Sequence, residues 1–555
     1  MYIRREVGRL LPHAAPSLSD FLFVSLLVWL FATGSGWEAL LADGDTGWHI
    51  RTGDYVLNTG SIPTTDLFSF SRPGEPWFAW EWLADVIFAL LHDRWDLVGV
   101  VVVAGVVIAL TAVVLFLHML WRGANVFAAL AVVLPCVGAA SIHFLARPHI
   151  FTLLLLAVSL WVLDRDRRAP GVSVWILVPL SALWANLHGG FLALLACVGL
   201  LAAGCAAEAL LVSGRCWTAA RRYAALTGAC SLATLLNPFG YRLHLHIAQY
   251  LRSDWIKEAV DEFQSPKFRS ESLLQFELLL LVSLLLAGIL LSKRRIADAL
   301  PVLFWAHLSL SSVRHVPVFV IVVGPLIARE LTCLWESWTA TAPTRSLAGI
   351  LNAVAQDLAP GFRRVSPWSV ALVLAVLWLT PSSRWPRDFP AAKFPVGLVG
   401  ANRDRLASAR IFTSDEWADY LIYRGWPRQR VFLDGRSDFY GPVLGKEYLR
   451  LLEGRTGWRD SLKKHGFRFV LLPEDAPLAS HLHACGDWRQ TAADRQAVLF
   501  ERISSAPVRS LIKGRCSTDS SVLEASRHEI QREGHPATTT LSVPGGFRGG
   551  LARAR

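Results

Sequence analysis

The sequence contains 555 residues, of which 53% are hydrophobic, and it carries a formal net charge of +11 at pH 7. Its mean hydropathy is +0.38. The apolar residues form blocks of about 20, the length of helix that crosses a hydrocarbon layer, which excludes an ordinary soluble domain. The basic residues fall between these blocks, so the charge indicates membrane orientation and not binding to nucleic acid.

The apolar blocks predict a polytopic α-helical membrane protein with about eleven spans. They lie near residues 20–41, 97–120, 124–142, 148–163, 172–187, 190–212, 223–237, 273–291, 297–312, 314–332 and 367–380. Lys and Arg gather in alternate connections, including those at 4–9, 122, 165–168, 215–222, 293–295 and 363–364. Because positively charged loops remain in the cytoplasm, the N-terminus is expected inside and the region after Pro381 outside.

This topology divides the chain into four parts. We expect a cytoplasmic N-terminus (1–19), a transmembrane domain (20–380) with an external loop (42–96), an external α/β domain (381–503) and a disordered basic tail (504–555). In the domain, the pattern predicts strands at Arg410–Phe412, Arg430–Asp434, Arg468–Pro473 and Val498–Ile503, and helices at Glu416–Arg424 and Gly445–Glu453. Abundant Ala, Leu and Arg with little Lys and Met is typical of a bacterial source, so we expect the bacterial inner membrane.

The first external loop carries the strongest candidates for chemistry. Asp43, Gly44 and Asp45 stand where the first span leaves the membrane, and an amphipathic stretch predicted to lie in the interface, Trp77–Phe88, carries Glu81. Two carboxylates that flank a glycine could hold a divalent cation against a phosphate, or one could act as general base toward a hydroxyl. The alternative is that Asp43 only caps a helix and Asp45 is solvated.

Other span exits on the same side also carry polar residues. These are Arg147 and His149 in Ser141–His149, Asn186 and His188 in Trp184–Gly190, the turn Asn237–Gly240, and Arg314 and His315 after Ser311. Ionisable groups at membrane depth are costly, so they indicate function. An external arginine opposes the charge bias, and a phosphate or carboxylate would hold it there. The alternative is a structural ion pair with a loop carboxylate.

Histidines are frequent on this face. They are His49, His92, His143, His149, His188, His244, His246 and His315. No pair has the i, i+4 spacing of a helical zinc site, so interfacial packing or substrate hydrogen bonding is favoured over a His-bound metal.

Several motifs recur in one order along residues 20–503. They are D-x-D-x-x-W-H-I-x-x-G (Asp43–Gly53), G-x-I-P-x-x-D-x-F-S (Gly60–Ser69), E-W-L (Glu81–Leu83), A-R-P-H (Ala146–His149), W-A-N-L-H-G-G-F (Trp184–Phe191), L-N-P-F-G (Leu236–Gly240), R-H-V-P (Arg314–Pro317) and V-F-L-D-G-R-x-D-x-Y (Val431–Tyr440). With these motifs the chain resembles the GT-C superfamily of membrane glycosyltransferases, and more narrowly a bacterial branch of GT-C-like proteins.

The resemblance implies an inverting hexosyl- or pentosyltransferase. Its donor would be a polyprenyl-phosphate-linked sugar, and its acceptor a glycan, a lipid or a protein. By the same resemblance, Asp43 and Asp45 are catalytic or bind a metal such as Mg²⁺ or Mn²⁺, and Glu81 or Asp66 assists. The expected substrate-binding residues are Trp48, His49, Asp66, Arg147, His149, Asn186, His188, Arg314 and His315.

Two other functions remain open. A lipid or glycan transporter or flippase would show repeated halves and ionisable groups near the bilayer midplane, whereas the polar groups here lie at span exits. A non-catalytic assembly protein would use its external domain to bind a partner. The transferase hypothesis requires that Asp43, Asp45, Glu81, Arg147 and Arg314 surround one site at the outer leaflet.

Overall fold

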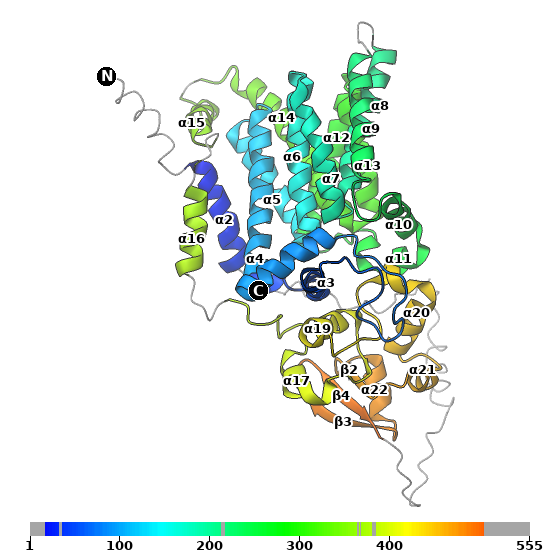
Figure 1. The fold of residues 1–555 in the computed structure, drawn as a ribbon. Coiled ribbons are helices and arrows are strands. Elements are labelled where there is room, and N and C mark those ends of the chain that lie inside the picture. Colours follow the sequence, from blue (N-terminus) through cyan, green and yellow to red (C-terminus); the bar gives the residue numbers. More distant parts are fainter. Residues whose placement is uncertain are drawn as a thin grey trace, which may run out of the picture.

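We describe the chain from a computed structural model, shown in Figure 1. It describes residues 17–32, 36–212, 217–343, 345–362, 366, 368–379 and 385–503. The predicted tail (504–555) and most of the predicted N-terminal segment (1–19) lie outside these residues. The fold is mostly helical, as predicted, with a bundle of apolar helices above a small domain that contains a sheet.

Among the described residues, five helices are long and apolar enough to cross a membrane. They are α4 (Trp82–Trp121), α5 (Val126–Ala140) with η2 (Ser141–His143), α8 (Phe191–Leu211), α12 (Glu271–Ser292), and η5 (Val313–His315) with α14 (Val316–Thr339). Each corresponds to a predicted span. Their apolar residues supply most of the continuous core of the bundle.

The other predicted spans also fall on helices, which are shorter or more charged. They are α2 (Leu18–Ala32) with η1 (Gly36–Ala39), α6 (His149–Arg168), η3 (Val172–Ile176) with α7 (Leu177–Leu187), α9 (Thr218–Ala233), α13 (Ile296–Ser311) and α16 (Trp368–Leu379). The 15 residues of α2 extend roughly 22 Å, less than the hydrocarbon thickness. A further helix, α15 (Leu347–Phe362), lies in a predicted connection.

A sharp break divides α4 into two parts. Trp95 and Asp96 leave the helical conformation, with φ of 50° at Asp96. The part before the break runs obliquely beneath the bundle in Figure 1, and the part after it coincides with the predicted span 97–120. This agrees with the prediction of an interfacial segment at Trp77–Phe88, and it places Glu81 immediately before α4 at the lower end of the bundle.

Helices from two of the predicted external segments lie at this lower end. The first loop forms α3 (Asp45–Thr59), a helix that the sequence did not predict, followed by a turn closed by a bridge between Thr65 and Pro76. The stretch after α9 forms α10 (Tyr241–Arg252), α11 (Asp254–Ala259) and η4 (Asp261–Phe263). We call this end of the bundle, where the C-terminal domain lies, the domain end.

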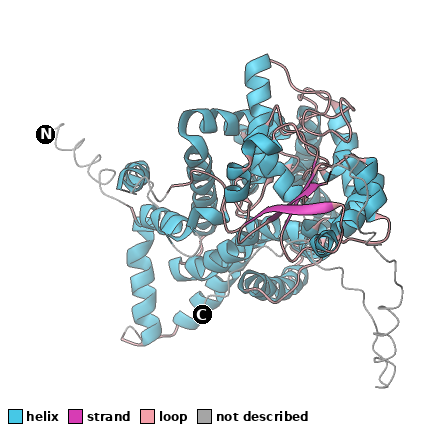
Figure 2. Ribbon diagram, turned by 90° about the horizontal axis from the view of Figure 1, so that it is seen from below, coloured by secondary structure: helices cyan, strands magenta, loops and turns pink. Residues whose placement is uncertain are grey.

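The C-terminal domain is built on a four-stranded sheet with the order β1-β2-β4-β3. β1 pairs with β2 in parallel, and β4 pairs with β2 and β3 in antiparallel fashion. The sheet lies among helices when seen from below in Figure 2. In chain order the elements are α17 (Val396–Ala401), α18 (Arg403–Leu406), β1 (Ile411–Phe412), α19 (Asp415–Gly425), α20 (Ser437–Leu452), α21 (Trp458–Lys464), β2 (Phe469–Leu472), α22 (Pro477–His483), β3 (Trp488–Ala493) and β4 (Val498–Arg502).

One predicted strand, Arg430–Asp434, is not part of this sheet. Val431 instead forms an isolated parallel bridge with Ser69 of the first loop. Its N–H donates to Phe68 O at 2.9 Å, and its carbonyl accepts from Phe70 N at 2.9 Å. The extended conformation was predicted correctly, but its backbone partners come from a distant loop. The prediction was therefore wrong about the sheet.

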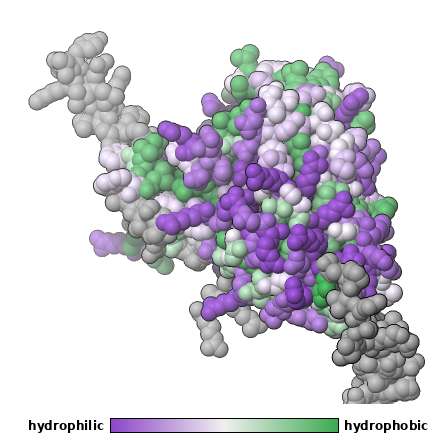
Figure 3. All heavy atoms as spheres, turned by 60° about the horizontal axis from the view of Figure 1, so that its bottom comes forward, coloured by the Kyte–Doolittle hydropathy of each residue, from purple (hydrophilic) through white to green (hydrophobic). Residues whose placement is uncertain are grey.

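The domain is docked tightly on the bundle. Side chains of α19, including Trp417 and Tyr420, belong to the same buried core as the membrane helices, whereas the far side of the domain has a core of its own. On α20, an added Cβ at Gly445 would lie 2.1 Å from the Trp255 ring of α11. Figure 3 brings the domain end forward and shows hydrophilic side chains gathered over the middle of that face.

Candidate active site

The start of α3 gathers the acidic residues of the first motif. The Oδ1 atom of Asp43 accepts the backbone N–H of Asp45 at 2.9 Å, and the Trp48 indole donates to Asp45 Oδ1 at 3.1 Å. A carboxylate in the first helical turn also lies near the positive end of the helix dipole. Asp43 therefore has the capping contact that the sequence left open, but Asp45 is buried and not solvated.

Arg147 links three carboxylates. Its guanidinium lies 2.8 Å from Asp43 Oδ2, 2.7 Å from Asp45 Oδ2 and 2.9 Å from Glu262 Oε1. The connection before α6 is held in place by Ala146, whose N–H donates to Leu40 O at 2.7 Å and whose carbonyl accepts from the Thr46 hydroxyl at 2.9 Å. The ion pair with a loop carboxylate that the sequence left open is thus present for Arg147.

Glu262 is a residue of this cluster that sequence reasoning missed. It lies on η4, and its backbone carbonyl accepts a hydrogen bond from the Ser312 hydroxyl at 2.8 Å. Burial opposes its ionisation, but the positive charges of Arg147, then of His143 and Arg314, outweigh burial and hold its pKa below the usual range. Glu262 is therefore an ionised partner of Arg147.

Glu81 lies among histidines at the same end of the bundle. Its carboxylate oxygens are 3.4 Å from His188 Nε2 and 3.8 Å from His49 Nε2, and His49 Nδ1 is 2.6 Å from Asp85 Oδ1. Burial raises the pKa of Glu81 to about 8, although Arg147 opposes the shift. Burial also lowers the pKa of His49 and of His188. At neutral pH the site therefore holds a protonated carboxyl between neutral imidazoles.

Arg314 is held differently from Arg147. Its guanidinium lies 4.4 Å from the centre of the Phe263 ring, and it donates to the Tyr250 hydroxyl at 3.4 Å. Among the residues that the structure describes, its environment includes no carboxylate within ion-pair distance. Its positive charge acts on both Glu81 and Glu262. Arg314 is thus a cation at the site whose close partners are aromatic rings and not carboxylates.

Two further histidines, His143 and His149, lie beside His188 at the same end of the bundle. His149 Nε2 is 2.6 Å from the backbone carbonyl of His143, and the two imidazole centres are 5.5 Å apart. The His188 ring follows at 6.4 Å from His149. The Nε2 atom of His143 is buried and has no hydrogen-bond partner in the described part of the chain. A ligand with acceptor or donor oxygens would satisfy that atom.

The C-terminal domain covers the acidic side of the cluster. An added Cβ at Gly435 would lie 2.1 Å from Asp45 Oδ1, so this turn touches Asp45 directly. Asp438 follows in the first turn of α20 and lies 2.8 Å from His246 Nε2 of α10. Its negative charge is one of those that raise the pKa of Glu81. The motif Val431–Tyr440 therefore lies against the site.

Some predicted site residues have other partners. Asp66 pairs with Arg436 at 2.8 Å and accepts from Ser69. Asn186 accepts from the Trp82 indole at 2.9 Å and donates to the carbonyls of residues 182 and 236. His315 is 3.2 Å from the Leu308 carbonyl. The cluster itself brings together Asp43, Asp45, Trp48, His49, Glu81, Arg147, His149, His188 and Arg314, with Glu262, Asp85 and His143 in addition.

The arrangement does not fit a divalent cation between Asp43 and Asp45. The two carboxylates already share the Arg147 guanidinium, which would have to move to admit a metal ion. Within the described ranges, no three His, Cys, Asp or Glu side chains form a group that could hold a metal.

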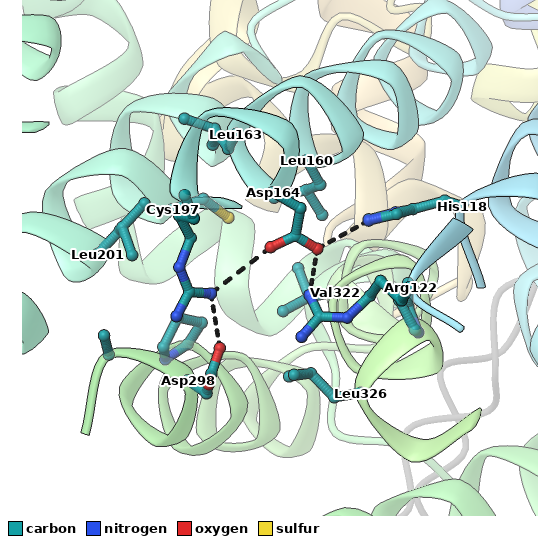
Figure 4. A pocket seen from close by; sticks show the side chains of 14 residues that line it. His118, Arg122, Leu160, Leu163, Asp164, Cys197, Leu201, Asp298, Val322 and Leu326 are labelled. Carbon is teal, nitrogen blue, oxygen red and sulfur yellow. Dashed lines mark hydrogen bonds and ion pairs between the residues drawn. The ribbon is translucent and has the colours of Figure 1, made fainter. Parts of the chain in front are cut away.

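A second charged cluster lies at the opposite end of the bundle and surrounds a cavity of about 60 Å³ (Figure 4). Arg122 and His118 contact Asp164, and Arg167 lies 2.6 Å from Asp298. Arg122 and Arg167, which the sequence assigned to topology alone, are therefore also ion-paired. Because carboxylates neutralise both arginines, we assign this cluster to stabilisation of the helix ends.

No known protein-family model and no curated protein sequence matches this chain. Its structure is similar to that of the oligosaccharyltransferase of Archaeoglobus fulgidus tethered with an acceptor peptide, with a TM-score of 0.49 and 11% identity over 82% of this chain and 68% of that one. The structure of AglB from the same organism, in complex with an inhibitory peptide and a dolichol-phosphate, covers the same shares with a TM-score of 0.46 and 11% identity.

ArnT from Cupriavidus metallidurans, bound to undecaprenyl phosphate, is also similar. The match covers 87% of this chain and 98% of that chain at 13% identity and a TM-score of 0.44.

Proposed function

We propose that this protein is a membrane glycosyltransferase that moves a sugar from a polyprenyl-phosphate carrier to an acceptor hydroxyl on the outer face of the inner membrane. One observation carries the proposal: the cluster in which Asp43, Asp45 and Glu262 surround Arg147, next to Arg314 and Glu81, with Asp45 and Glu81 buried. The residues come from five separate segments of the sequence and meet at one end of the bundle.

In the proposed reaction, Asp45 is the general base. Its carboxylate takes the proton of the acceptor hydroxyl, and the hydroxyl oxygen forms a bond to the anomeric carbon. The bond between that carbon and the phosphate oxygen breaks, and polyprenyl phosphate leaves with the electron pair. A single displacement of this kind inverts the anomeric carbon. Arg147 holds Asp45 at 2.7 Å and so fixes the direction of its carboxylate.

Arg314 is the proposed partner of the leaving phosphate. A guanidinium suits phosphate oxygens, and the close contacts of Arg314 are aromatic rings, so its charge is available to an anion. Protonated Glu81 adds a hydrogen-bond donor beside it, and neutral His188 lies within reach. These groups would stabilise the negative charge that develops on the phosphate.

The proposed topology follows from the charge bias. The N-terminus would be cytoplasmic, and the domain end would face the outside, where polyprenyl-linked donors of this kind are used. The polar cluster lies at one end of the bundle and not midway along its helices, which supports a transferase over a transporter. An assembly protein would need no buried, pKa-shifted carboxyl at this place.

The test is sugar transfer in membranes that contain the full chain. Tritium-labelled polyprenyl-phosphate hexoses serve as donors, and the membrane fraction supplies acceptors. We expect Asp45→Asn to lose transfer by about 10²- to 10⁴-fold, the usual contribution of a general base. Addition of EDTA is expected to leave wild-type transfer unchanged, because Arg147 occupies the space between Asp43 and Asp45.

Arg167→Lys is the control. Arg167 is paired with carboxylates, as Arg147 is, but at the opposite end of the bundle. The Arg167→Lys variant is expected to transfer sugar like wild type. The Arg147→Lys variant is expected to lose activity, as the Asp45→Asn variant does. Equal transfer by wild type and Asp45→Asn would remove Asp45 from the catalytic role.

A further inference from the structure

The helix α19 of the C-terminal domain lies directly on α3, the helix that begins at Asp45. Two glycines make this approach possible, since an added Cβ at Gly44 would lie 2.4 Å from the Glu416 carbonyl oxygen and 2.8 Å from Asp419 Cβ. At Gly47 it would lie 2.9 Å from the Asp419 carbonyl oxygen. Arg51 closes the contact with a 2.8 Å hydrogen bond from its Nε to the Tyr423 carbonyl. These contacts therefore fix which face of α19 is turned toward Asp45.

Asp419 points from this face into the acidic cluster. It is 1% exposed, and its Oδ1 accepts the backbone N–H of Gly435 at 3.1 Å. An added Cβ at Gly435 would lie 2.1 Å from Asp45 Oδ1 and 2.9 Å from Asp419 Oδ2. Oxygen atoms of both carboxyl groups therefore lie within 3 Å of one point beside Gly435, which places the two groups close together.

We propose that Asp419 is a positioning residue that forms a carboxyl pair with Asp45 and keeps the base proton-accepting. The proposal deepens the proposed function, because it names a residue of the C-terminal domain that acts through Asp45. Two carboxyl groups in one buried space do not both ionise, so the pair holds one proton. Arg147 pairs with Asp45, which places the negative charge on Asp45 and the proton on Asp419.

The charged groups around the two residues agree with a negative charge on Asp45 and a proton on Asp419. Asp45 faces Arg147, Asp43 and Glu262, while Asp419 faces Asp434 and Asp415 on its own domain. Burial raises the pKa of Asp419 well above its ordinary value, and the charges of Asp45 and Asp434 raise it further. Burial also raises the pKa of Asp45, while Arg147 opposes the shift. When Asp45 takes the acceptor proton, Asp419 loses its negative neighbour, so its own proton can leave.

The experiment compares pH profiles of kcat/KM for the full-length wild type and Asp419→Asn. The asparagine retains a carbonyl oxygen for the Gly435 N–H but carries no charge. We expect the acid limb to move to higher pH, because an asparagine amide is a weaker hydrogen-bond donor to ionised Asp45 than the protonated Asp419 carboxyl. Asp388→Asn is the matched control, since Asp388 accepts from Tyr420 of α19 at 3.2 Å and is expected to keep the wild-type profile. An unchanged limb in Asp419→Asn overturns the proposal.

Infrared titration gives a second readout that does not depend on sugar transfer. The difference spectrum of wild type minus Asp419→Asn is expected to contain a protonated carboxyl band at neutral pH. That band supports the pair even in a preparation that transfers no sugar, so failure of the proposed function is recognised separately. If this band is absent from the difference spectrum although Asp419→Asn elutes and melts like wild type, the proposed carboxyl pair is overturned.

Gly435→Ala tests the geometry of the pair. The added methyl group would stand between the two carboxyl groups, where it meets both within 3 Å. We expect loss of most of the activity, with the acid limb displaced in whatever activity remains. A variant as active as wild type, with the same limb, shows that the turn does not touch Asp45 and overturns the proposal.

Discussion

Glu81 and Glu262 show how surroundings divide similar side chains into different forms. Glu262 lies 2.9 Å from the Arg147 guanidinium and is ionised. Glu81 is more deeply buried, and the groups within ion-pair distance of it are two neutral imidazoles, so burial raises its pKa to about 8. A site with one ionised and one protonated carboxyl has both a proton acceptor and a proton donor at neutral pH.

The pH dependence of transfer follows from Glu81. If protonated Glu81 donates to the leaving phosphate, activity is fully present below its pKa and is lost as the pH rises through about 8. Glu81→Gln cannot ionise but still donates through its amide, so this alkaline limb is expected to disappear while part of the activity remains. The measurement is kcat/KM against pH for both proteins. If the alkaline limb of wild type persists in Glu81→Gln, the limb belongs to another group.

Most residues of the site could be predicted, but not all of them. Asp45, Glu81, Arg147 and Arg314 were recognisable because charges at span exits need a reason to be there. Glu262 resembles any solvated loop acid in the sequence, and only its approach to Arg147 distinguishes it. For Asp66, its place in a motif gave no sign that Arg436 is its partner.

Among the elements, α3 is the one on which the site depends most. Its sequence has a low share of apolar residues and contains two glycines, so neither periodicity nor propensity predicts a helix. The same glycines allow α19 and α4 to lie against it, since an added Cβ at Gly53 would lie 2.0 Å from the Asp85 carbonyl oxygen. β3 escaped prediction for a related reason, because five of its six side chains are polar or small and not buried.

Gly47→Ala is expected to destabilise the protein. The new methyl group would meet the Asp419 carbonyl and Tyr423 Cβ, neither of which is a flexible side-chain end. Overpacking of this kind costs about 1–3 kcal/mol in the free energy of unfolding, measured in detergent. Gly228→Ala in α9 is the control, since no atom lies within 4 Å and a gain of up to about 1 kcal/mol is expected. Equal effects of the two changes would contradict close packing of α3 on α19.

At the scale of the whole molecule, a buried ion network fixes the domain to the bundle. Arg436 lies 2.8 Å from Asp66 and 2.6 Å from Asp434, with its guanidinium 4.4 Å from the centre of the Trp77 ring. Asp66 and Trp77 belong to the first loop, so domain and loop share one buried cation. Sequence patterns identified both segments but carried no sign of this pairing, because it depends on residues 370 positions apart.

Loss of this network is expected to release the domain. Arg436→Ala would leave two buried carboxylates without a counter-charge, at a cost of about 3–5 kcal/mol. Proteolysis between the bundle and the domain should become faster, and sugar transfer should fall with it. Arg468→Ala, which removes an exposed arginine paired with Glu501, is expected to cost at most about 1 kcal/mol. Similar proteolysis of both variants would show that the domain is held by other contacts.

The contacts between α3 and α19 also fix the order in which the site is completed during synthesis. Arg51 and its partner Tyr423 are separated by 372 positions, so a ribosome that adds about 5–20 residues per second needs roughly 20–75 s to pass from one to the other. During that time the base has neither its carboxyl partner nor its cover. A nascent chain is therefore inserted in the membrane before its proposed site is complete.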